Sequence, residues 1–162
     1  MPDLTPLWIS IKVGFISTII VSILGIFICR TLYKRKGHAT QFLESLILLP
    51  IVLPPTVLGF ILIIVFSPRT FVGQFFQNVL HLPVVFTMTG AVIASVIVSF
   101  PLMYQHTIQG FRSINPKMLN TARTMGASER KIFYRLILPL SKRSIIAGIM
   151  MSFARAIGEF GA

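Results

Sequence analysis

The chain has 162 residues, of which 54% are hydrophobic and 12% charged, with a mean hydropathy of +0.84 and a formal net charge of +11. This composition lies far outside the range of soluble globular domains and predicts an integral membrane protein embedded in the lipid bilayer. The cations lie in short loops between apolar segments and form no stripe with interleaved aromatic residues, so the pattern excludes a nucleic-acid partner.

The first apolar segment, residues 7–29, is long enough to cross ~30 Å of hydrocarbon at ~1.5 Å per residue. It follows no basic region or small-residue cleavage site, so we expect a retained span, with Lys12 snorkelling to the interface. The lone Cys29 supplies neither a disulfide framework nor a thiolate metal site. Small and weakly polar residues predict a face for close helix packing: Ser10, Gly14, Ser17, Thr18, Ser22 and Gly25.

The next loop, residues 30–41, carries four cations and no acidic residue: Arg30, Lys34, Arg35 and Lys36. Cytoplasmic loops of membrane proteins are enriched in Lys and Arg. We therefore expect this loop in the cytoplasm and the N-terminus outside.

The second apolar segment, residues 42–66, has LPIVLPPTVLGF at its centre. Pro54 and Pro55 remove two backbone donors and disfavour α geometry before them, so the helix must kink or break near Leu53. In a bilayer such a break persists only where protein or a water-filled cavity satisfies the freed carbonyl groups. One interpretation is that the break lines a passage through the protein, with Thr56 and Gly59 facing it. The alternative is a kink that serves packing alone.

Residues 67–83 carry a single cation, Arg69, and are expected outside. Their apolar residues recur at helical spacing, which predicts a short helix along the interface or a contact for an incoming partner: Phe71, Phe75, Phe76 and Leu80.

A third span, residues 84–104, has two rows of mostly small residues for helix packing: Gly90, Ala94 and Val98 beside Ala91, Ser95 and Ser99. We interpret His106 as an interfacial residue because no second ligand stands at metal spacing.

The loop at residues 105–143 holds eight cations against one acid, Glu129, and is expected to be cytoplasmic. Its centre predicts two short helices with a corner between them. Asn115 is a good N-cap, Pro116 suits the first helical position and Gly126 suits a helix end that needs positive φ. Ser128 then caps the second helix.

In the first of these helices, Met118, Ala122 and Met125 fall on one side. The second helix has an apolar face and is expected to close at Pro139. That face consists of Ile132, Phe133, Leu136 and Ile137. From charge alone, the pair of helices could also lie on the anionic inner surface of the membrane.

A fourth apolar segment, residues 144–162, contains Arg155 and Glu159 four positions apart on one helical face. A charge within a span costs ~2.5–3.5 kcal/mol even on the lenient insertion scale, so each needs a partner or a wet cavity. The two residues either form a structural ion pair or line a polar pathway through the membrane.

The string ARTMGA, whose Gly126 is separated by nine residues from the start of LILP, resembles the EAA loop of ABC-importer permeases. Ala122, Gly126, Leu138 and Pro139 match that motif; Asn120, Thr121 and Leu136 depart from it. The strings LPPTVLG and FARAIGEFGA resemble molybdate-type permeases, with sulfate permeases close behind, and the three matches occur in the order seen in that family.

The resemblance implies an all-α polytopic transmembrane helix bundle of the ABC-importer permease type, with about four spans in residues 1–162. It implies a cytoplasmic coupling loop at residues 112–140 that docks on a separate ABC ATPase subunit, a second permease copy in a homodimer, and an extracytoplasmic oxyanion-binding protein. Family members continue beyond the final Gly-Ala, so the last part of the fold is expected to be missing.

The residues expected to contact the ATPase are Ala122, Arg123, Gly126, Ala127, Ser128, Leu138 and Pro139. The candidates for the pathway or gate are Pro54, Pro55, Thr56, Gly59, Arg155 and Glu159. No cofactor is expected: the sequence has no Gly-rich GK[ST] nucleotide loop, and no enzymatic constellation stands out. The predicted solute is molybdate, with sulfate or tungstate as alternatives. A membrane scaffold or regulatory protein without transport activity is the alternative of another class.

Overall fold

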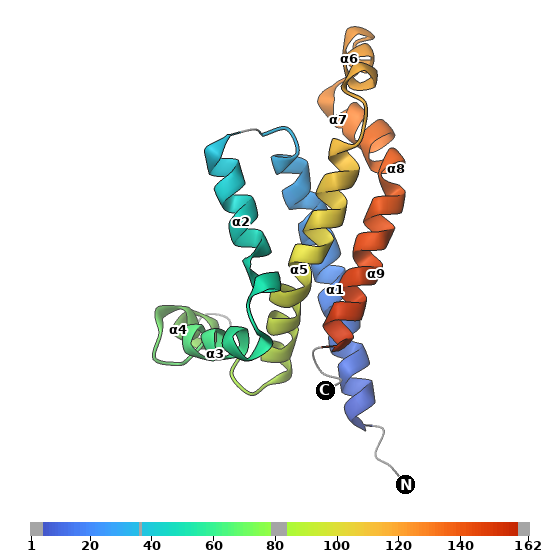
Figure 1. Cartoon of the computed structure of the whole chain (residues 1–162). Coiled ribbons are helices and arrows are strands. Elements are labelled where there is room, and N and C mark those ends of the chain that lie inside the picture. The colour runs from blue at the N-terminus through green and yellow to red at the C-terminus, as the bar shows by residue number, and fades with distance from the viewer. Residues whose placement is uncertain (1–4, 36, 79–83, 159–162) are drawn as a thin grey trace.

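A computed structural model of the chain describes residues 5–35, 37–78 and 84–158. Within these residues every regular element is a helix, as predicted (Figure 1). The elements are α1 (Thr5–Leu32), α2 (His38–Val52), α3 (Pro55–Val65), α4 (Phe71–Asn78), α5 (Met88–Arg112), α6 (Pro116–Thr124), α7 (Glu129–Ile132), the π-helix η1 (Phe133–Ile137), α8 (Leu138–Leu140) and α9 (Lys142–Gly158).

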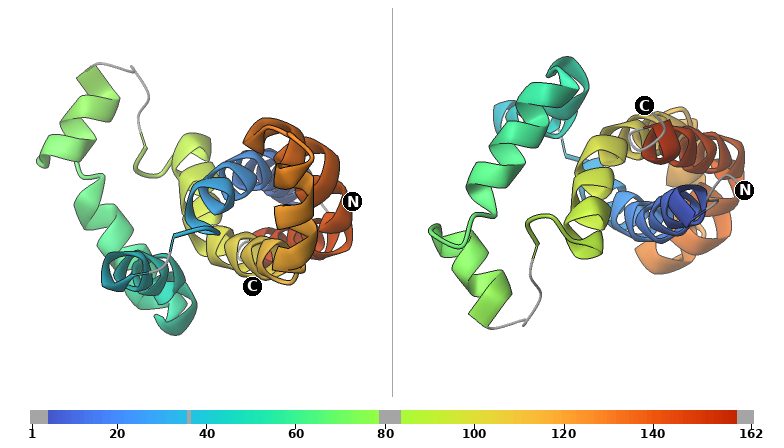
Figure 2. Two further views of the ribbon diagram at one scale, coloured as in Figure 1. Left: turned by 90° about the horizontal axis from the view of Figure 1, so that it is seen from above. Right: turned by 90° about the horizontal axis from the view of Figure 1, so that it is seen from below.

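The centre of the molecule is a bundle of α1, α5 and α9, seen end-on in Figure 2. Its interior contains hydroxyl groups as well as apolar side chains. The Ser17 hydroxyl donates to the Ser95 hydroxyl across α1 and α5 at 3.1 Å, and Ser152 on α9 donates to the carbonyl of Ser99 at 3.3 Å. Such hydrogen bonds between helices stabilise bundles in a bilayer, where the alternative is an unpaired polar group.

Close approach of these helices depends on small residues. A Cβ atom at Gly25 of α1 would lie 2.6 Å from Cγ of Met103 on α5, and one at Gly148 of α9 would lie 3.0 Å from the Met103 sulfur. The predicted packing face of the first span is therefore confirmed. In the third span, Ser95, Val98 and Ser99 are buried as predicted.

The predicted row in the third span differs from the structure at Gly90. There, the atoms nearest to a Cβ belong to Val84, in the segment that enters the same helix. The reason is that α5 begins only at Met88, where the Thr87 hydroxyl accepts a hydrogen bond from the Gly90 amide at 3.3 Å. The helix also continues to Arg112, past the predicted end at residue 104.

The predicted break near Leu53 is confirmed and is larger than a kink. Leu53 has an extended backbone (φ −73°, ψ 136°), and the chain bends by 114° between α2 and α3. As Figures 1 and 2 show, α2, α3 and α4 form an arm beside the bundle. Of these three helices, α2 makes the main contact with the bundle, through α5.

Two helices of the described residues, Leu7–Leu32 and Met88–Arg112, are each long and apolar enough to cross a membrane. The number rises to four if the bent pair α2–α3 is one span and the pair Glu129–Leu140 with Lys142–Gly158, bent by 66°, is another. The predicted short helix at Phe71, Phe75 and Phe76 is present as α4; Leu80 lies outside the described residues.

Candidate functional site

The predicted corner between two short helices is present at one end of the bundle, beyond α5. The Asn115 side chain accepts a hydrogen bond from the Lys117 amide at 2.9 Å, and Pro116 occupies the first turn of α6. Gly126 has φ +78° after the end of α6, as predicted. No atom lies within 4 Å of a Cβ built at Gly126, so the need for glycine here is one of backbone conformation and not of space.

The second helix begins as predicted, with the Ser128 hydroxyl accepting from the Lys131 amide at 3.4 Å. The predicted end at Pro139 is wrong. A π-turn, η1, lets the Leu138 amide bond to the carbonyl of Phe133, which places Pro139 in the first turn of α8, where its missing N–H needs no partner. The helical run therefore passes through Pro139 and stops at Ser141.

One face of this second helical run packs against the bundle. Ile132, Phe133 and Ile137 are buried, as the apolar pattern indicated, and the Phe133 ring stands edge-on to that of Phe111 on α5, with centroids 5.6 Å apart. Ser141 is also buried, and its hydroxyl donates to the carbonyl of Gly110 at 3.0 Å. The run is thus fixed to α5 at both ends.

In α6, the inward residue is Leu119, which is 9% exposed. The two methionines that the sequence placed on one side lie outward: Met118 is 39% exposed and Met125 is 81% exposed. Ala122, placed on the same side, is half-buried against the core. An outward apolar face on a short, otherwise polar helix is typical of a surface that another protein covers.

A small ion-pair network fastens the corner to the end of α1. Glu129 accepts from Arg123 Nε at 2.7 Å and from the ammonium group of Lys34. The Arg123 guanidinium also donates to the Asn120 side chain at 2.6 Å. Hydrogen bonds from Arg123 and then Lys34 lower the pKa of Glu129 to about 2.

A second contact with α1 lies beside this network. The Arg30 guanidinium stacks 4.6 Å from the ring centroid of Phe133 and donates to the Tyr134 hydroxyl at 3.1 Å. Sequence reasoning used Arg30 and Lys34 only as markers of membrane topology and missed both contacts. The Lys34 contact could have been predicted from Glu129, because it is the single acid among the eight cations of its loop.

The predicted ATPase-contact residues share this one region but differ in exposure. Arg123, Gly126, Ser128 and Pro139 are exposed, whereas Ala122, Ala127 and Leu138 are half-buried and packed against the core. The half-buried residues therefore hold the corner in place beneath its exposed surface.

The predicted pathway residues do not come together. Pro54, Pro55 and Thr56 are exposed at the break between α2 and α3, while Gly59 lines an apolar groove of about 380 Å³ between α3 and the start of α5. Arg155 is half-buried on α9, on the other side of α5 from the arm (Figures 1 and 2). Its predicted neighbour Glu159 lies outside the described residues.

No group of three or more His, Cys, Asp or Glu side chains that could hold a metal ion occurs in residues 5–35, 37–78 and 84–158. The features that stand out chemically are therefore the exposed corner and its ties to the bundle.

Comparison with known proteins connects this geometry to transport. A family model described as binding-protein-dependent transport system inner membrane component matches residues 21–162. A putative molybdenum transport system permease protein of Bacillus subtilis is 42% identical over 158 residues, which cover 98% of this chain and 70% of the relative. A molybdenum transport system permease protein of Escherichia coli is 33% identical over 161 residues, covering 99% and 70%. A probable sulfate transport system permease protein of Chlorella vulgaris is 29% identical over 153 residues, covering 94% and 57%.

Proposed function

This chain belongs to the family of binding-protein-dependent transport system inner membrane components, of the molybdate type, and from this we propose that it is the membrane subunit of an ATP-driven molybdate importer. In this proposal a separate ABC ATPase subunit hydrolyses ATP, and an extracytoplasmic binding protein delivers the anion. The single observation that carries the proposal is the corner at Gly126, which exposes apolar side chains outward and is fastened inward to α1 and α5.

The ATPase contact is proposed at the exposed surface of α6 and the turn that follows it. Met118 and Met125 offer the apolar contact, and Arg123 and Ser128 offer polar groups at its edge. Methionine suits such a surface because its unbranched side chain adapts to the partner. Ala122, Ala127 and Leu138 support this surface from below.

Motion would pass from this surface to the membrane helices through the contacts described above. A displacement of the corner pulls on α1 through Glu129 and Lys34, on α5 through Phe133 and Phe111, and on α9 directly through the chain at Ser141. Closure of the ATPase pair would in this way rock the helices between inward and outward openings, as in alternating access.

The proposed topology has the corner in the cytoplasm and the start of α1 outside, because the loops at the corner end of the bundle carry most of the cations. The proposed assembly is a homodimer with the pathway between subunits. Large apolar residues exposed on α1 and α3, such as Phe15, Phe27 and Phe60, would face lipid or the second copy.

Molybdate is favoured over sulfate because relatives named for molybdenum transport are more similar to this chain than the sulfate permease. Tungstate has the shape and charge of molybdate, so it remains an alternative solute. The residues chosen from the sequence are proposed for the route of the anion in two groups that lie apart within one copy of the chain: Pro54, Pro55, Thr56 and Gly59 on the arm, and Arg155 on α9 with Glu159 predicted beside it. Among these, Arg155 supplies the positive charge that an oxyanion requires.

The test is uptake of radiolabelled molybdate by cells that lack their own molybdate permease and express this chain with its ATPase and binding protein. We expect uptake that excess tungstate or molybdate suppresses and that excess sulfate does not. Uptake no higher than in cells without the chain, together with no ATPase subunit recovered with the purified chain, would instead favour a membrane scaffold.

A further inference from the structure

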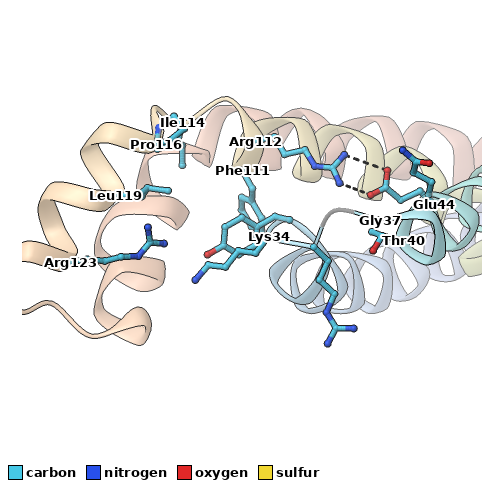
Figure 3. A pocket seen from close by; sticks show the side chains of 13 residues that line it. Lys34, Gly37, Thr40, Glu44, Phe111, Arg112, Ile114, Pro116, Leu119 and Arg123 are labelled. Atoms are coloured by element: carbon cyan, nitrogen blue, oxygen red, sulfur yellow. Dashed lines mark hydrogen bonds and ion pairs between the residues drawn. The ribbon is translucent and has the colours of Figure 1, made fainter.

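A cleft of about 830 Å³ lies beside the corner, where the ends of α1 and α5, the start of α2 and α6 meet (Figure 3). Its lining combines apolar side chains with four cations and one acid. The apolar members include Tyr33, Phe111, Ile114 and Leu119; the charged members are Lys34, Arg35, Arg112, Arg123 and Glu44.

The charges in the cleft are not balanced. Four cations against Glu44 leave an excess of three, and counting Glu129, which binds Lys34 and Arg123 from outside the cleft, leaves an excess of two. Glu44 is occupied by Arg112, with oxygen–nitrogen distances of 2.5 and 3.3 Å, as drawn in Figure 3. Arg35 is exposed and makes no ion pair with any side chain in the described part of the chain.

The position of the cleft along the bundle indicates which kind of anion it would bind. It lies where both helices long enough to span a membrane end, α1 at Leu32 and α5 at Arg112, which is the depth of the lipid headgroups. A free inorganic anion would gain nothing from the half-buried apolar side chains of Tyr33 and Ile114, whereas a lipid buries its glycerol and first methylene groups against such surface.

We propose that this cleft binds the headgroup of an anionic phospholipid of the cytoplasmic leaflet, with its phosphate beside Arg35 and its glycerol on the half-buried apolar side chains of Tyr33 and Ile114. The proposal rests on the proposed function, which puts the corner in the cytoplasm. A lipid in this position contacts both the loop after α1 and the chain between α5 and α6. It would therefore hold α6 against the bundle beside the ion pairs that Lys34 and Arg123 make with Glu129.

The test uses the purified complex of this chain with its ATPase in neutral detergent. Phosphatidylglycerol is added and the lipid retained per permease is counted by native mass spectrometry, with phosphatidylcholine as the zwitterionic comparison. Arg35→Glu is expected to weaken phosphatidylglycerol retention about tenfold and to leave phosphatidylcholine unchanged. The matched control is Arg143→Glu, which makes the same charge change at an exposed residue of α9 outside the cleft, and it is expected to retain lipid like the wild type.

Equal retention by the two variants would overturn the site, and so would displacement of the lipid by millimolar inorganic phosphate. A photoreactive group at position 35 is expected to label lipid; labelling of the ATPase subunit instead would assign the cleft to a protein partner. Molybdate uptake by cells that express the wild-type chain, measured as described above, separates the two proposals, because normal uptake with equal lipid retention by the two variants rejects only the lipid site.

Discussion

The bundle of α1, α5 and α9 and the arm of α2, α3 and α4 are both rich in apolar residues but are stabilised differently. In the bundle, glycines and serines bring backbones together and buried hydroxyls pair across helices. In the arm, the chain breaks at Leu53, and large side chains such as Val52 and Phe60 stay exposed. The comparison teaches that the bundle depends on its own close contacts, whereas the arm depends on whatever surrounds it in the membrane.

The strongest test of this difference is to replace one glycine in each region by a large residue. Gly25→Leu places a Cβ 2.6 Å from Met103 Cγ, so it is expected to overpack the bundle and cost about 1–3 kcal/mol. Gly59→Leu, in the arm, meets no atom within 4 Å of its Cβ and is the matched control. The measurement is thermal unfolding of both variants in detergent. A loss of stability as large for Gly59→Leu would contradict the distinction.

The corner extends the comparison to a segment that packs against the bundle but also depends on one special backbone conformation, the positive φ of Gly126. Gly126→Val forces a β-branched residue to φ +78°, at a cost of about 1–2 kcal/mol, and is expected to displace α6 from α7. We expect the ATPase subunit to be lost from the purified complex, with the thermal unfolding of the bundle little changed. Gly126→Asn should keep most of the binding, since asparagine tolerates positive φ; equal loss by both variants would refute this account.

The ion-pair network tests whether the corner moves with α1. Glu129→Gln is expected to speed amide hydrogen exchange at residues 123–131 several-fold, while α5 stays protected. The effect on stability is small, at most about 1 kcal/mol, because the Glu129 side chain is 53% exposed. The matched variant Glu44→Gln removes a carboxylate from the arm and should leave this exchange unchanged.

The pH dependence of that network follows from the lowered pKa of Glu129. Since the folded pKa is about 2 and the ordinary value is 4.5, the stabilisation is complete above pH 4.5 and is lost as the pH falls through about 2. Exchange at residues 123–131, corrected for its intrinsic pH dependence, should therefore be flat between pH 7 and pH 5. A steep change in that interval would show that another group holds the corner.

The smallest expected effect is at Arg30. Arg30→Lys keeps the charge but loses the planar stack on Phe133 and the hydrogen bond to Tyr134. A cation–π stack of this kind is worth about 0.5–1 kcal/mol at an exposed site. Thermal unfolding should shift slightly, and Arg30→Gln should shift it further. The same change at Arg35, which stacks on no ring of the described residues, is the control.

Local chemistry predicted much of the corner. Caps at Asn115 and Ser128 and the positive φ of Gly126 depend on a few neighbouring residues, so the sequence contains all the information they need. The inward turn of Leu119 could not be predicted in this way. It depends on the cluster that includes Phe111 and Phe133, which the chain assembles only in three dimensions.

The features that could not be predicted from the sequence depend on how the rest of the chain is arranged in three dimensions. Lys34 and Glu129 are 95 positions apart, so no spacing rule joins them. The prolines after Leu53 predicted a break, but the angle of 114° is not encoded by the prolines themselves. The π-turn before Pro139 is a third case, because a proline pattern alone indicates where a helix is disturbed and not how the disturbance is absorbed.

The buried hydrogen bond from Ser141 to Gly110 holds the chain just before α9 against α5, so Ser141 is the point about which α9 would pivot. The corner lies on the short arm of a lever, and α9, with 17 residues and a length of ~25 Å, is the long arm. A tilt of about 10° around Ser141 would therefore carry the far end of α9 through about 4 Å, which is close to the width of a small side chain. In the proposed transport cycle, leverage of this kind would convert a slight rotation at the protein surface into a displacement large enough to open or shut a passage for an ion.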